Sequence, residues 1–139
     1  MKLAATVIYV DDVRPVLAFY RAAFGLEPRF LDLDVQLSGR AADGRYHYAA
    51  LATEGGSLQF GTHDLGTLLM PAYARPADGR PSGVEIFFYT SEVAGSYGRA
   101  LEAGAQAVAE PKVMPWGQTV AYVRSVEGTF IGIGSPLPE

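Results

Sequence analysis

The chain has 139 residues, a formal net charge of −4 and no cysteine. This composition excludes disulfides, thiolate metal sites and a thiol nucleophile, and the scattered lysines and arginines form no stripe that would follow a nucleic-acid backbone. No apolar run approaches the ~18 residues that cross a bilayer, and the first residues lack a signal-peptide pattern. We therefore expect a cytoplasmic protein with neither nucleic acid nor membrane as a partner.

The first half of the chain predicts a strand, a helix and three further strands. Residues 3–10 are apolar and β-branched, as in a buried strand. Asp12 is a helix-capping residue, apolar side chains then recur at helical spacing over 13–24, and Gly25 is suited to end that helix. The three further strands are expected at 28–37, 46–53 and 57–62, separated by turn-forming residues.

The second half repeats this order after a stretch rich in glycine and proline. Residues 64–82 predict a long connection, and the sequence leaves open whether it is a lid or a simple linker. A strand at 84–89 and a helix at 93–101 follow, and then strands at 105–110, 118–124 and 129–134. Ala5 and Glu85 hold equivalent places in the two first strands, which indicates an internal repeat.

These patterns predict an α+β fold in a single domain spanning residues 1–139. It would consist of two βαβββ modules, at about 1–63 and 83–139, joined by a linker at about 64–82. One such module leaves a face of its mostly antiparallel sheet bare, so two modules set side by side would curl around a shared cleft.

Short motifs in both halves carry a family resemblance. They are Val10–Val13, Phe19–Tyr20, Phe24–Leu26, Gly83–Glu85, Ala103–Ala105, Pro115–Gln118, Tyr122–Arg124 and Glu127–Thr129. In order and spacing the chain resembles the vicinal-oxygen-chelate superfamily, which contains glyoxalase I, bleomycin-resistance proteins and extradiol dioxygenases. The resemblance implies the two-module fold and a homodimer.

The resemblance also implies where a metal would bind. In metal-dependent members, four side chains from the first and last strand of each module hold a divalent ion, and these positions fall at Ala5, Gln59, Glu85 and Gly132. Ala5 and Gly132 have no donor atom, whereas divalent ions need several oxygen or nitrogen ligands. We therefore expect no cofactor, with a divalent metal on Gln59 and Glu85 as the alternative.

The remaining candidates concern the cleft. Strand alternation places Glu85 with aromatic residues on one face, where the carboxylate is a candidate general base; the alternative is a solvated glutamate. The expected ligand-binding residues are Tyr9, Gln59, Phe87, Tyr89, Trp116 and Phe130, although an ordinary filled core would explain the aromatic residues equally well. Small residues at positions 5 and 132 would leave space for the ligand. His63 is expected in an exposed loop, with the cleft mouth as the alternative.

Three functions remain open at this stage. The first is binding of a small apolar or aromatic molecule without a metal, as in bleomycin-resistance proteins. The second is a metal-dependent lyase, isomerase or dioxygenase with an atypical site. The third is a metal-free enzyme that uses Glu85 as its acid or base.

Overall fold

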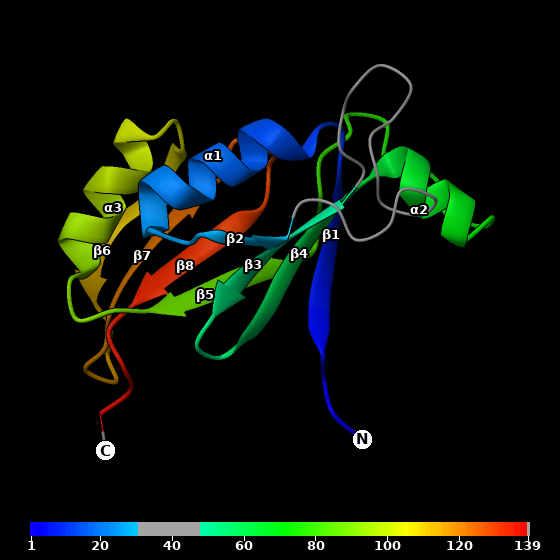
Figure 1. Cartoon of the computed structure of the whole chain (residues 1–139). Coiled ribbons are helices and arrows are strands. Elements are labelled where there is room, and N and C mark those ends of the chain that lie inside the picture. The colour runs from blue at the N-terminus through cyan, green and yellow to red at the C-terminus, as the bar shows by residue number, and fades with distance from the viewer. Residues whose placement is uncertain (31–47, 139) are drawn as a thin grey trace.

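The computed structural model describes residues 1–30 and 48–138, which form two four-stranded sheets and three helices (Figure 1). The first sheet has the order β1-β4-β3-β2 and the second has the order β5-β8-β7-β6. The strands are β1 (Ala5–Val10), β2 (Pro28–Phe30), β3 (Tyr48–Thr53), β4 (Gly56–Thr62), β5 (Glu85–Tyr89), β6 (Gln106–Val113), β7 (Thr119–Arg124) and β8 (Phe130–Gly134). The helices are α1 (Val13–Phe24), α2 (His63–Leu69) and α3 (Val93–Glu102). The remainder of the strands predicted at 28–37 and 46–53 lies outside the described residues.

Each half of the chain has the predicted βαβββ order, so the α+β prediction is confirmed. In both sheets the first strand runs parallel to the last strand of its module, and the other pairs are antiparallel. The register repeats as well, because Tyr9 lies opposite Gly61 in the first sheet and Tyr89 lies opposite Gly134 in the second. Gln59 and Gly132 therefore occupy equivalent places in the two last strands, and neither sheet closes into a barrel.

Helix α1 begins and ends where its capping residues predict. The Asp12 side chain accepts a hydrogen bond from the Arg14 backbone N–H at 3.1 Å. At the other end Gly25 has φ of 68°, a left-handed conformation that favours glycine. The apolar stripe between these caps is buried, and it fixes which face of α1 packs against the first sheet.

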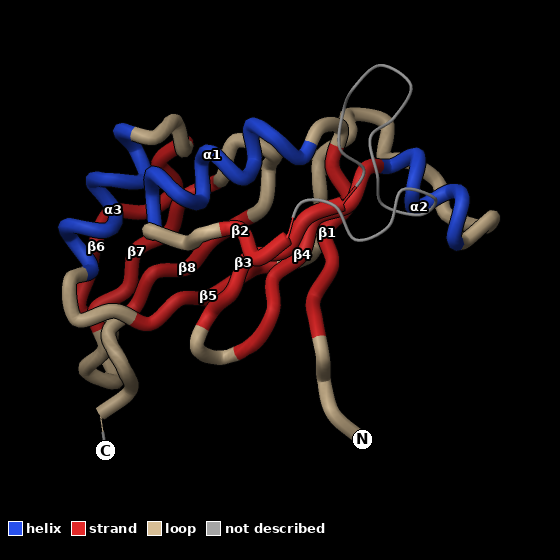
Figure 2. Tube along the Cα trace, viewed as in Figure 1, coloured by secondary structure: helices blue, strands red, loops and turns tan. Residues whose placement is uncertain are grey.

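The two modules share one hydrophobic core, because α1 and α3 pack against each other on the same side of the sheets (Figure 2). The rings of Phe24 and Phe88 are 4.9 Å apart between centroids, and those of Tyr20 and Phe60 are 5.1 Å apart. Among residues 1–30 and 48–138, no layer covers the sheet faces turned away from these helices. We call these the bare faces; they carry Ala5, Val7, Tyr9, Gln59 and Gly61 in the first sheet, and Glu85, Phe87, Tyr89, Phe130, Gly132 and Gly134 in the second.

The connection between the modules is more ordered than predicted. Its first part forms α2, a helix that the sequence did not predict. The Thr62 hydroxyl accepts from the Leu65 N–H at 3.2 Å, and Leu65 is buried, which together start and anchor this short helix. Further along, the Arg75 guanidinium donates to both Asp11 carboxylate oxygens at 2.8 and 3.0 Å, and so ties the connection to the first module.

No described helix is long and apolar enough to cross a bilayer.

A buried hydroxyl joins the modules, and its removal should destabilise the fold. The Tyr20 hydroxyl on α1 donates to Glu127 Oε2 at 3.0 Å, and burial raises the pKa of Tyr20 well above 10.0. Tyr20→Phe leaves the Glu127 carboxylate without this donor, so we expect a loss of about 1–3 kcal/mol in the free energy of unfolding. Urea unfolding measures this loss, and Tyr97→Phe on α3 is the matched control, expected to change it by less than about 0.5 kcal/mol.

The pH dependence gives an independent check on the same residue. Because the folded-state pKa of Tyr20 is raised, its contribution is complete below the unfolded value of about 10 and is lost as the pH rises through the folded value. Wild-type stability should therefore fall in alkali above about pH 10 more steeply than that of Tyr20→Phe. Equal slopes for the two proteins would contradict this assignment.

Candidate functional site

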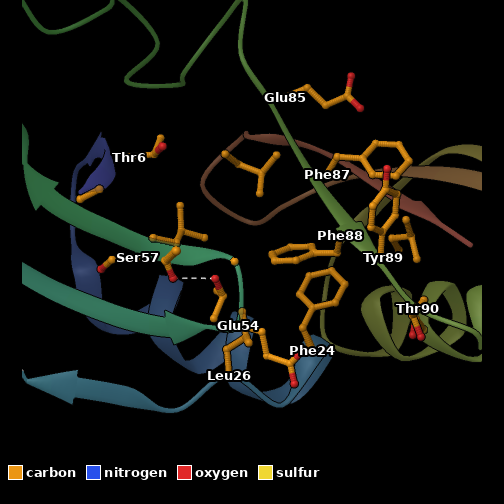
Figure 3. A pocket seen from close by; sticks show the side chains of 18 of the residues that line it. Thr6, Phe24, Leu26, Glu54, Ser57, Glu85, Phe87, Phe88, Tyr89 and Thr90 are labelled. Atoms are coloured by element: carbon orange, nitrogen blue, oxygen red, sulfur yellow. Dashed lines mark hydrogen bonds between the residues drawn. The ribbon is translucent and has the colours of Figure 1, made fainter. Parts of the chain in front are cut away.

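A cavity of about 920 Å³ lies between the modules (Figure 3). One side is formed by the start of β1, the end of α1 and the β3–β4 turn, and the other by β5 and the first turns of α3. Phe24 and Phe88 point toward one another at its inner side, while Glu85, Phe87 and Tyr89 project from the other face of β5 (Figure 3). The structure therefore brings together Ala5, Glu85, Phe87 and Tyr89 of the residues expected at a ligand site, whereas Gln59 and Gly132 do not line this cavity.

The space expected above Gly132 is filled by an aromatic ring. A Cβ atom built on Gly132 would clash with the Phe87 ring and lie 2.6 Å from Glu85 Oε1, and one built on Gly134 would lie 2.6 Å from Phe87 Cζ. The Phe87 ring thus rests on Gly132 and Gly134, two glycines on the same face of β8, although 40% of the residue remains exposed. Glycine at these positions allows close packing of the ring instead of leaving a void.

Glu85 lies at the start of β5, and its side chain is exposed (Figure 3). The aromatic residues on its face are Phe87 and Tyr89, whose rings meet edge to face with centroids 5.8 Å apart. Both residues follow Glu85 on the same face of β5, and in the single chain their rings do not surround its carboxylate. The apolar enclosure that would favour a general base is therefore absent here.

The residues at the four family positions do not form a metal-binding set. Ala5 and Gly132 supply no donor, and the Gln59 amide donates to Ser57 Oγ at 3.0 Å. Over residues 1–30 and 48–138, no group of three or more histidine, aspartate or glutamate side chains is arranged to hold an ion. Glu85 is then the one carboxylate at these positions, and one carboxylate with one amide is a poor donor set for a divalent cation.

Three other expected ligand-binding residues lie apart from the cavity. Phe130 packs beneath the Arg124 guanidinium, which is 4.6 Å from its ring centroid. Trp116 is 57% exposed, and its indole N–H donates to Gln118 Oε1 at 2.9 Å. Tyr9 lies at the far end of β1, where its ring covers Gly61.

A polar cluster near Tyr9 was not anticipated. His63 is only 5% exposed, so the expectation of an exposed loop position is wrong. Its Nδ1 is 2.6 Å from the Tyr73 hydroxyl, its Nε2 is 3.2 Å from the Gly79 carbonyl oxygen, and the Tyr9 and Tyr73 rings are 5.0 Å apart. The single signal in the sequence was the pair Gly61 and Gly66, which permits these rings to approach the backbone.

Two tyrosines near Tyr9, namely Tyr48 and Tyr73, have raised pKa values. Burial, and secondly the nearby Tyr9, raise the pKa of both Tyr48 and Tyr73. Tyr48 lies opposite Gly61 on β3, so its side chain shares the bare face with Tyr9. A raised pKa keeps these hydroxyls protonated, which suits recognition of a ligand and disfavours a phenolate nucleophile.

Comparison with known proteins identifies close structural relatives. The sequence model of the Glyoxalase/Bleomycin resistance protein/Dioxygenase superfamily matches residues 2–132. A glyoxalase-related enzyme from Fulvimarina pelagi is similar with a TM-score of 0.77 and 19% identity, over 98% of this chain and 88% of that one. TioX from Micromonospora sp. ML1 has a TM-score of 0.71 and 20% identity, over 99% of this chain and 100% of that one.

A family enzyme from Burkholderia phytofirmans PsJN is similar at a TM-score of 0.74 and 20% identity, over 99% of this chain and 100% of that one. At such identities these structures support the fold alone. No curated protein matches the chain.

The packing of Phe87 on Gly132 can be tested by adding one methyl group. Gly132→Ala forces Phe87 out of its place, so we expect a loss of about 1–3 kcal/mol in the free energy of unfolding. Removing the ring should relieve the clash, so Phe87→Ala combined with Gly132→Ala should cost less than the sum of the two single changes. Chemical denaturation of the three variants measures this coupling.

Gly98→Ala is the matched control, because a Cβ at this position in α3 meets no atom within 4 Å. It should stabilise the helix by about 0.5–1 kcal/mol. If Gly132→Ala were equally harmless, Phe87 would not rest on β8.

Proposed function

Because the chain belongs to the Glyoxalase/Bleomycin resistance protein/Dioxygenase superfamily, we propose that it binds a small apolar or aromatic molecule between its modules, without the metal site that the family often uses. The observation that carries this proposal is the cavity of about 920 Å³, which is lined in part by aromatic rings and by Ala5. The family resemblance implies a metal ligand at position 5, and alanine has no donor atom. The size of the cavity falls in the range of about 300–1,000 Å³ that is usual for small-molecule sites.

The composition of the walls supports this class of ligand. Phe24 and Phe88 present rings at the inner side, and Phe87 and Tyr89 border the opening. Planar apolar molecules gain affinity by burial and by stacking on such rings. The polar atoms around the cavity, including the Glu54 carboxylate and the Arg99 guanidinium, would orient the ligand.

A catalytic role receives less support. The metal-dependent alternative requires donors that the four family positions do not supply. The acid–base alternative requires Glu85 to meet its substrate in a protected site, whereas its side chain is exposed in the single chain. Binding without transformation needs only the cavity.

The open edges of the sheets support a homodimer. β1 pairs with β4 and β5 pairs with β8, so each first strand has one edge without a strand partner among the described residues. Open strand edges readily recruit another chain. A second copy laid against the bare faces would cover Val7, Tyr89 and any ligand lying on these faces; Tyr89 is 60% exposed in the single chain.

Ligand binding is tested with a fluorescent naphthalene probe and protein dialysed against a chelator. We expect saturable binding and a rise in the melting temperature with probe concentration. Tyr89→Ala should weaken binding about tenfold, because an exposed stacking partner at the cavity mouth is lost. Val113→Ala on β6, far from the cavity lining, is the control and should bind like wild type.

The same samples test the metal-free part of the proposal. Added Mn²⁺, Ni²⁺ or Zn²⁺ should leave both the probe affinity and the melting temperature unchanged. A protein that ignored every probe but melted at a much higher temperature with one of these ions would contradict the proposal and favour a metal-dependent enzyme.

The dimer is tested separately by light scattering. Wild type should have the mass of two chains, and Val7→Lys should shift it toward one chain because a charge would be placed on the bare face. Val113→Lys, an exposed position on β6, should remain a dimer. A wild-type mass of one chain would refute the dimer and leave ligand binding within a single chain untouched.

A further inference from the structure

The buried His63 has a partner for each of its ring nitrogens. Nε2 faces the Gly79 carbonyl oxygen at 3.2 Å and the Asp11 carboxylate at 3.6 Å. Nδ1 faces the Tyr73 hydroxyl at 2.6 Å. Asp11 in turn accepts two hydrogen bonds from Arg75. The imidazole is therefore held by groups that follow the first strand and by groups in the connection between the modules.

These partners determine where the protons lie. A carbonyl and a carboxylate can only accept, so Nε2 must carry the imidazole proton. In the neutral ring, Nδ1 then has a lone pair and accepts the hydrogen bond from Tyr73. The Tyr73 hydroxyl therefore donates its proton to His63. The lone pairs on the Tyr73 oxygen remain available to accept a hydrogen bond from another group.

Tyr73 stands at one end of the first bare face. Its ring packs on Gly66 and against Tyr9, and the Tyr9 ring in turn covers Gly61. Tyr48 lies on the other side of Gly61. Tyr73 is only half-buried, so part of this residue stays open to solvent.

We infer that Tyr73 is a specificity-determining residue, and that its oxygen accepts a hydrogen bond from a hydroxyl or amino group on the ligand. His63 is a positioning residue that acts through Tyr73 by fixing the direction of this hydrogen bond. The inference rests on the proposed function, because it concerns a ligand that extends from the cavity along the first bare face. It narrows the ligand class to elongated aromatic molecules with a donor at one end.

The dimensions of the face set the length of such a ligand. Ala5 borders the cavity, and Tyr9, which contacts Tyr73, lies four residues further along β1. At about 3.3 Å per residue the two positions are roughly 13 Å apart. Two benzene rings joined by a short rigid link cover this distance, and the tyrosine rings offer them stacking surfaces.

A pair of probes that differ only in the donor tests the inference. trans-4-Hydroxystilbene can donate to Tyr73, and trans-4-methoxystilbene cannot. At about pH 8, wild type should bind the hydroxyl probe about fivefold more tightly. trans-4-Aminostilbene, which also has a donor, should bind more tightly than the methoxy probe, and an equal affinity would remove amines from the inferred ligand class.

Variants separate a role in recognition from a role in structure. Tyr73→Phe should bind both probes with the affinity of wild type for the methoxy probe, so the preference disappears. His63→Phe frees the Tyr73 proton to donate outward, so the preference should fall to one or reverse in favour of the methoxy oxygen. His63→Gln, which retains a hydrogen-bonding side chain, is the second variant if His63→Phe does not fold. Tyr97→Phe on α3 is the control and should keep the fivefold preference.

The outcomes distinguish the inference from the proposed function. If wild type binds both stilbenes equally, or if Tyr73→Phe keeps the preference, the role of Tyr73 is refuted while ligand binding stands. If the naphthalene probe and both stilbenes fail to bind, the proposed function and the inference are refuted together.

Discussion

The packing of α1 against α3 is the contact on which the rest of the structure depends. Phe24, at the end of α1, meets Phe88 of β5, so the helix layer of one module is continuous with the core of the other. Both helices then lie on the same side of the two sheets (Figure 2). As a result, the described part of the chain leaves both bare faces uncovered and the first strands with open edges. The cavity borders these open strands and is a direct consequence of this arrangement.

Local signals were sufficient to predict most of the fold. Asp12 and Gly25 mark the ends of α1 because capping depends on a few neighbouring atoms, and strand alternation separated the core side of β5 from its bare face. The sequence did not predict helix α2, because Gly66 and the nearby prolines are residue types typical of loops. Its stability comes from burial of Leu65 against the first module, which no local pattern reveals.

The site was less predictable because its features depend on distant segments. Strand alternation predicted the sheet face on which Phe87 lies. The packing of its ring on Gly132 and Gly134 depends on the register of β5 against β8. The burial of His63 depends on the chain returning ten residues later with Tyr73 and again with Gly79. Nothing in the sequence around His63 indicates these partners, so an isolated histidine after a strand was read as exposed.

Different aromatic rings pack on the equivalent glycines of the two modules, Gly61 and Gly134. In the first, Tyr9 covers Gly61, which lies directly opposite it, and Tyr48 and Tyr73 lie nearby. In the second, Phe87 reaches over Gly134 from two residues earlier on its strand, so Tyr89, the equivalent of Tyr9, is displaced toward solvent. One bare face therefore ends in a group of tyrosines, and the other carries the Phe87 ring beside the Glu85 carboxylate. An elongated ligand that contacts both faces would meet tyrosines at one end and the Phe87 ring at the other. This difference between the two modules would determine the orientation in which the ligand binds.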